Sequence, residues 1–169
     1  MPKPLEIRLG ELFEGSELWL AVTESSTGGL LGHLITNVPG SSTYFKGGVI
    51  AYANEVKADV LGVSSQTLDT FGAVSKETVI EMARGVRRIL DSDIGVAISG
   101  IAGPGGGTDE KPVGTTVIGM SALEKETTKK FIFKGERMDI KAQAAQAAMQ
   151  LVVDFLEAQI HGKNEGTES

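Results

Sequence analysis

Two glycine-rich turns, each directly after an apolar run, most constrain the fold of this 169-residue chain. Residues 24–29 (ESSTGG) follow the apolar run 18–22, and residues 99–108 (SGIAGPGGGT) follow the apolar run 94–98. Open α/β sheets bind ligands in the loops at strand ends, and glycine lets backbone N–H groups come close to an anion because it has no Cβ. The two turns therefore predict a cleft for a small molecule that carries a phosphate group.

Composition and charge exclude several classes of site. The chain has no cysteine, which rules out disulfides and thiolate chemistry, and its two histidines, His33 and His161, are too few for a multi-histidine metal site. A formal net charge of -6 without a basic stripe argues against nucleic-acid binding. No apolar run reaches the roughly 18 residues of a membrane span, and the first residues lack a signal-peptide pattern. We expect a cytoplasmic protein without membrane contact.

The spacing of apolar residues predicts alternating strands and helices. Strands are expected over residues 17–23, 44–53, 93–99, 113–122 and 127–133. Helices are expected over residues 5–13, 27–36, 54–61, 65–71, 75–90 and 137–160. The helix over 75–90 has the clearest pattern, with apolar residues on one face and Ser75 as its N-cap.

This order of elements predicts an α/β fold of three layers, α/β/α, around a mixed sheet of about five strands. The expected hairpin over 113–133 makes at least one strand pair antiparallel. The length suits one domain, residues 1–160, followed by a polar tail, residues 161–169, that we expect to be disordered. Alanines on the last predicted helix permit close packing on a sheet or on a second subunit, and we expect a homo-oligomer.

The side chains available for catalysis point to a serine activated by a lysine. Neither glycine-rich turn is followed by the lysine of a P-loop, and a Ser-His-Asp triad would need His33, which lies in an apolar, glycine-rich helix. Ser25 stands at a strand-to-helix turn, where the first N–H groups of the helix face the same space and provide an oxyanion hole. The residues alone also allow Ser25, Ser26 or Thr27 to be a simple helix cap, the commoner role of such residues.

Lys57 is the candidate base because it lies where a predicted strand runs directly into a predicted helix. A lysine acts as a base only when burial or a positive neighbour lowers its pKa, and a solvated surface lysine is the alternative. Tyr52 is expected to share the proton or to orient the lysine. Its alternative is a half-buried strand tyrosine.

The second glycine-rich turn is the candidate phosphate site. Its backbone N–H groups and one hydroxyl are expected to bind the anion: Gly103, Gly105, Gly106, Gly107 and Thr108. The alternative is a glycine-rich turn that only reverses the chain. Five glycines within eight residues exceed what a turn needs, which favours the binding role.

Several long segments, in order and at compatible spacing, resemble the C-terminal domain of the CinA family. They are ESSTGG (24–29), residues 35–57, GAVSKET (72–78), SGIAGPGGGTDEKPVGT (99–115) and KGERMDIKAQAA (134–145). We expect no further domain before these segments, so the resemblance is to the stand-alone form, the nicotinamide-nucleotide amidohydrolases. The chain departs from the family in two places: Ser26 stands where a cysteine is usual, and Lys141 stands where an arginine is common.

The resemblance implies deamidation of nicotinamide mononucleotide to nicotinic acid mononucleotide and ammonia. It matches the nucleophile and the base to Ser25 and Lys57, and a site tyrosine to Tyr52; the N–H groups of Thr27, Gly28 and Gly29 are expected to stabilise the oxyanion. It implies a three-layer α/β/α fold, a pyridine nucleotide as the small-molecule partner, and no metal or organic cofactor. The alternative is a non-catalytic module that binds a pyridine nucleotide or regulates a larger assembly. A module that only binds the nucleotide would also keep both glycine-rich turns.

Overall fold

The sheet of this computed structural model, which describes residues 1–166, has five strands. They are β1 (Leu20–Glu24), β2 (Phe45–Ile50), β3 (Ile94–Gly100), β4 (Thr115–Ala122) and β5 (Lys125–Ile132). Their order is β2-β1-β3-β4-β5, in which β1 pairs in parallel with β2 and β3, whereas β4 pairs antiparallel with β3 and β5. The predicted mixed sheet and its hairpin are therefore confirmed.

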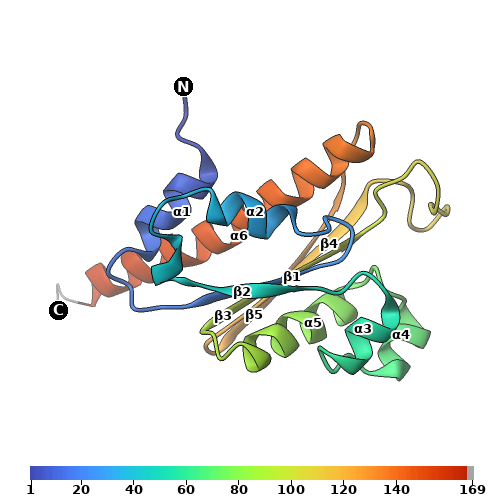
Figure 1. Ribbon diagram of the computed structural model, residues 1–169, viewed down its shortest axis with the longest axis horizontal. Helices are drawn as coiled ribbons and strands as arrows, with labels where there is room; N and C mark the ends of the chain where they lie inside the picture. Colours follow the sequence, from blue (N-terminus) through green and yellow to red (C-terminus); the bar gives the residue numbers. More distant parts are fainter. Residues whose placement is uncertain (167–169) are drawn as a thin grey trace.

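Helices cover both faces of the sheet (Figure 1). One face carries α1 (Leu5–Phe13), α2 (Leu30–Thr36) and α6 (Arg137–Glu165), and the other carries α3 (Asn54–Asp59), α4 (Ser65–Phe71) and α5 (Lys76–Ile89). A short 3-10 turn, η1 (Ser41–Thr43), precedes β2. The α/β/α architecture predicted from the sequence is confirmed.

The hydrophobic core has two parts, one on each side of the sheet. Successive side chains of a strand point to opposite faces, so Val22 of β1 packs among residues of α1, α2 and α6, while its neighbour Ala21 packs against α5. The central strands β3 and β4 are buried along nearly their whole length, as expected for strands covered on both faces. The apolar side chains buried on both faces hold the strands in place. The candidate site is built from residues at the ends of these strands.

Two helix boundaries differ from those predicted by three residues or more. The helix expected from residue 27 begins at Leu30, because Gly28 and Gly29 have φ angles of +60° and +109°, which a right-handed helix does not accept. The last helix continues to Glu165 instead of ending at residue 160, so residues 161–165, expected as part of a disordered tail, are helical in the structure. Extending a formed helix by polar residues costs little once its first turns are packed. Residues 167–169 of the expected tail lie outside the described residues.

Candidate active site

A cavity of about 200 Å³ lies where the parallel strands β1 and β3 end. Its lining comes from the segments after β1 and β2, from the end of β3 and the segment after it, from the loop before α5, and from the start of α6: Ser25, Ser26, Tyr52, Asn54, Lys57, Ala73, Val74, Ser99, Gly100, Ala102 and Arg137. The carboxyl ends of parallel strands are the usual position of a ligand site in such sheets, and this cavity contains all three residues predicted to be catalytic.

Lys57 and Ser25 are in direct contact at the bottom of this cavity. The Nζ atom of Lys57 lies 3.1 Å from Oγ of Ser25 and donates to the backbone carbonyls of Ala51 at 2.9 Å and Tyr52 at 3.0 Å. Lys57 is only 1% exposed, and this burial lowers the pKa of its amine. A neutral amine has two N–H bonds and one lone pair. The two carbonyls can accept both N–H bonds, which leaves the lone pair for the Ser25 hydroxyl.

The Glu24 carboxylate holds the turn that presents Ser25. Glu24 is buried at the end of β1, and it accepts the Thr27 hydroxyl at 2.6 Å and the N–H groups of Leu31 at 2.8 Å and Gly32 at 3.1 Å. These N–H groups belong to the first turn of α2 and lack a partner within the helix. Glu24 therefore fixes α2 to the end of β1. The Thr27 hydroxyl donates to this carboxylate and is therefore engaged in holding the turn.

The oxyanion donors differ in part from the prediction. The Gly28 N–H donates to the carbonyl of Ser25 at 3.1 Å, so this group closes the turn. Within residues 1–166, the N–H groups of Ser26, Thr27 and Gly29 have no protein acceptor. The turn before α2 therefore still offers main-chain donors beside the Ser25 hydroxyl, as oxyanion stabilisation requires.

Tyr52 contributes its backbone to the contact with Lys57. The residue is 61% exposed, and its phenol oxygen accepts a hydrogen bond from Nη2 of Arg137 at 3.3 Å. The structure thus brings the Tyr52 carbonyl, but not its hydroxyl, to Lys57. Proton transfer between Ser25 and Lys57 needs no intermediate group at their distance of 3.1 Å.

The second glycine-rich turn meets the cavity only at its beginning. Gly100 and Ala102 line the cavity, and the carbonyl of Gly103 accepts from Nη1 of Arg137 at 2.7 Å. The four other predicted phosphate-binding residues are exposed and lie outside the lining: Gly105, Gly106, Gly107 and Thr108.

Local packing explains two of these positions. The Thr108 hydroxyl accepts from the N–H of Lys111 at 3.0 Å, and the Thr108 N–H donates to the Lys111 carbonyl at 2.8 Å, so this threonine closes its own loop. A Cβ on Gly107 would lie 2.7 Å from the backbone nitrogen of Val113. Close packing, which the sequence does not distinguish from ligand binding, accounts for this glycine.

Arg137 is the main site residue that the sequence analysis missed. It opens α6, and its guanidinium connects the glycine-rich turn, through the Gly103 carbonyl, to the Tyr52 phenol. Among the residues that line the cavity, Arg137 and Lys57 alone carry basic side chains. The described part of the chain gives Arg137 no carboxylate partner. A guanidinium with free donors can bind a phosphate in two-point geometry.

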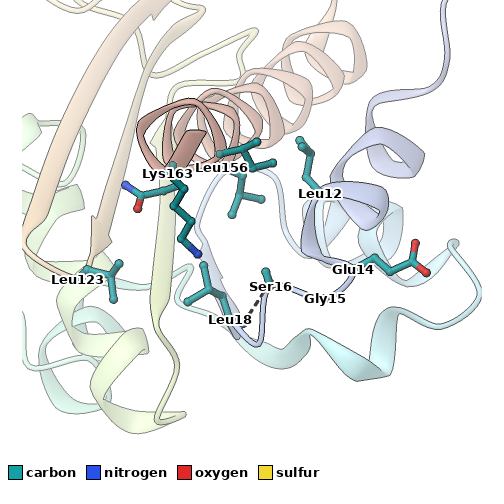
Figure 2. A pocket seen from close by; sticks show the side chains of 10 residues that line it. Leu12, Glu14, Gly15, Ser16, Leu18, Leu123, Leu156 and Lys163 are labelled. Carbon is teal, nitrogen blue, oxygen red and sulfur yellow. Dashed lines mark hydrogen bonds between the residues drawn. The ribbon is translucent and has the colours of Figure 1, made fainter. Parts of the chain in front are cut away.

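A larger hollow, of about 330 Å³, lies at the opposite end of the sheet (Figure 2). The apolar part of its lining is Leu12, Leu18, Leu123, Leu156 and Ile160, and its polar lining includes Ser16 and Lys163. It contains none of the predicted catalytic residues. Within residues 1–166 there is no cluster of three or more His, Asp or Glu side chains suited to a metal ion, and no helix there is long and apolar enough to span a membrane.

Comparison with known proteins shows that this chain matches one family. The family model described as the CinA C-terminal domain matches residues 3–156. A CinA-like protein of Desulfosudis oleivorans is 57% identical over 117 residues, which are 69% of this chain and 28% of that protein. The chain spans little more than a third of the length of the first curated relatives it matches.

Solved structures agree with this assignment. A CinA superfamily protein from Klebsiella pneumoniae superposes with a TM-score of 0.88 at 32% identity, covering 91% of this chain and 96% of the other. A competence/damage inducible protein from Agrobacterium tumefaciens gives a TM-score of 0.87 at 33% identity, covering 93% and 98%. Sequence and fold therefore lead to the same set of relatives.

Proposed function

The chain belongs to the CinA C-terminal domain family, and we propose that it is an amidohydrolase that deamidates nicotinamide mononucleotide. The products are nicotinic acid mononucleotide and ammonia. One observation carries the proposal: a buried lysine with a lowered pKa contacts a serine hydroxyl beside main-chain N–H groups that have no acceptor within residues 1–166. Nucleophile, base and oxyanion donors are the parts that acyl transfer requires.

The reaction would proceed through an acyl-serine. Lys57 takes the Ser25 hydroxyl proton as Oγ forms a bond to the carboxamide carbon, and the developing oxyanion is held by the N–H groups of Ser26, Thr27 and Gly29. As the C–N bond breaks, the Lys57 ammonium gives its proton to the nitrogen, which leaves as ammonia. Lys57 then takes a proton from water, whose oxygen attacks the acyl carbon. The bond to Ser25 breaks, and the proton returns to Oγ. The pyridinium charge makes this amide carbon more electrophilic.

Arg137 is the proposed contact of the 5′-phosphate. It carries a positive charge at the cavity, with no competing carboxylate within the described residues. The glycine-rich turn contributes through Gly100 and Ala102, which line the cavity, rather than through Gly105 to Thr108. In this proposal the Arg137 guanidinium binds the phosphate. The second glycine-rich turn contributes less to this binding than the sequence predicted.

The test is substitution of the pair, followed by identification of the acylated residue. Ser25→Ala and Lys57→Ala are each expected to lower ammonia release by at least about 10³-fold, as removal of a nucleophile or its base does in serine hydrolases. Circular dichroism checks that both variants keep the fold. Mass spectrometry of an enzyme trapped with a slow-deacylating ester of the mononucleotide should place the acyl group on Ser25.

Three outcomes would contradict this assignment. Near-normal turnover in either variant would exclude the Ser–Lys pair. An acyl group on Ser26 would move the nucleophile by one position. Thermal stabilisation by the mononucleotide without any ammonia release would favour a binding module over an enzyme.

A further inference from the structure

Ser99 is a second buried hydroxyl beside the nucleophile. It lines the cavity and is 1% exposed. In the register of the parallel strands, Glu24 pairs with Ile98, and the Ser25 N–H donates to the Ile98 carbonyl at 2.9 Å. Ser25 and Ser99 each follow these paired residues directly, on strands that are about 4.8 Å apart. The residues that carry these hydroxyls, Ser25 and Ser99, therefore lie at the same end of the β1–β3 pair.

The proton of the Ser99 hydroxyl is already in use. Its Oγ donates to the backbone carbonyl of Ala73 at 2.8 Å. A hydroxyl has one proton and two lone pairs, so Ser99 presents only lone pairs to the remaining space of the cavity. In this arrangement Ser99 acts as a hydrogen-bond acceptor.

We infer that Ser99 is a specificity-determining residue that accepts a hydrogen bond from the NH₂ group of the substrate carboxamide. The inference rests on the proposed amidohydrolase function. A primary amide has one acceptor and two donors. Its oxygen is directed to the N–H groups after β1, so its nitrogen needs an acceptor elsewhere. The carbonyls of Ala51 and Tyr52 are already bonded to Lys57, whereas the Ser99 lone pairs have no donor within the described residues.

This role selects amides over compounds that lack an N–H group. An ester of the same nucleotide has no proton for Ser99, and a carboxylate presents only acceptors to it. When the Ser99 acceptor is removed, the site should lose its preference for substrates that carry this N–H group. A purely structural Ser99, which only holds the Ala73 carbonyl, would affect amide and ester alike.

The test compares two substrates in matched variants of the whole chain. kcat/KM is measured for nicotinamide mononucleotide and for the methyl ester of nicotinic acid mononucleotide, which passes through the same acyl-Ser25. Ser99→Ala should lower the amide value roughly tenfold or more and the ester value less than about threefold. Ser99→Thr, which keeps the hydroxyl, should restore the amide value to within about threefold of wild type.

Ser121→Ala is the control. Ser121 is also a buried strand serine, but it interacts with Glu126 and Arg87, away from the cavity. Its substitution should leave the amide-to-ester ratio unchanged.

Equal losses for amide and ester in Ser99→Ala, or no loss in either, would overturn the inference and leave the proposed function standing. The inference would also be overturned if kcat/KM for the amide were as low in Ser99→Thr as in Ser99→Ala. If the wild type does not accept the ester, this comparison of the two variants on the amide alone is the test. A wild type that turns over neither compound would remove the proposed function and this inference together.

Discussion

The amine of Lys57 lies 3.1 Å from the hydroxyl of Ser25, although 32 positions separate them in the sequence. The contact forms because Ser25 follows the end of β1 and Lys57 lies on α3, directly after the neighbouring strand β2. Parallel pairing brings both segments to one edge of the sheet. The chemistry proposed for this chain depends on that single contact.

Activity should rise with pH, because only the neutral form of Lys57 can accept the Ser25 proton. Burial lowers the pKa of Lys57 from its ordinary value of 10.5. The rising limb of kcat/KM should therefore lie below pH 10.5, and its midpoint reports the pKa of the free enzyme. The measurement is kcat/KM for ammonia release between pH 5 and 10. A profile that is flat throughout this range would show that Lys57 is not the base.

Folding stability should also depend on the protonation of Lys57. Its pKa is lower in the folded state than in the unfolded state, so between these two values the unfolded chain binds more protons and stability rises with pH. Below the folded-state pKa, the cost of burying the charge is present in full. Relative to Lys57→Met, the wild type should gain at most about 1.4 kcal/mol per pH unit within this window.

Urea unfolding of both proteins at several pH values below 10.5 measures this difference. Using the difference between the two proteins cancels the titration of the other groups. A difference that stays constant, or that falls as pH rises, would contradict the lowered pKa.

Arg137→Ala should weaken binding of the mononucleotide and spare the riboside that lacks the phosphate. Loss of a charge-assisted hydrogen bond costs about 1.5–3 kcal/mol, which corresponds to a KM raised roughly 10- to 150-fold. Arg84→Ala is the matched control, since Arg84 is paired with Glu126 on the exposed surface. Equal effects on nucleotide and riboside would assign Arg137 a structural role, through its contacts with Gly103 and Tyr52.

Two glycines of the second turn should respond differently to alanine. A Cβ on Gly105 meets no atom within 4 Å, whereas one on Gly107 would lie 2.7 Å from the Val113 nitrogen. Gly105→Ala should therefore change the free energy of unfolding by less than about 0.5 kcal/mol, and Gly107→Ala should cost about 1–3 kcal/mol. Thermal or urea unfolding measures both. Strong loss of phosphate binding in a stable Gly105→Ala protein would restore the loop as the anion site.

The sequence predicted the sheet and singled out Ser25 and Lys57, which the structure brings into contact, because both leave local patterns. Apolar runs mark the buried strands, and the ESSTGG turn and the lysine after the second strand stand in recognisable motifs. Arg137 also stands in a recognisable motif, KGERMDIKAQAA (134–145), but the motif does not reveal its contacts, because its partners Gly103 and Tyr52 are 34 and 85 positions away. The start of α2 was misplaced because positive φ angles at Gly28 and Gly29 depend on the local packing of the turn.

The acceptors that hold the Lys57 amine are main-chain oxygens of Ala51 and Tyr52. Every amino acid supplies such an oxygen, so a substitution at position 52 can alter the exposed ring without removing the amine's partner. In the proposed reaction, the Tyr52 backbone holds the base, whereas the Tyr52 residue also lines the cavity that would receive the substrate. This separation would leave the preference among substrates free to diverge in evolution while the chemical step is retained.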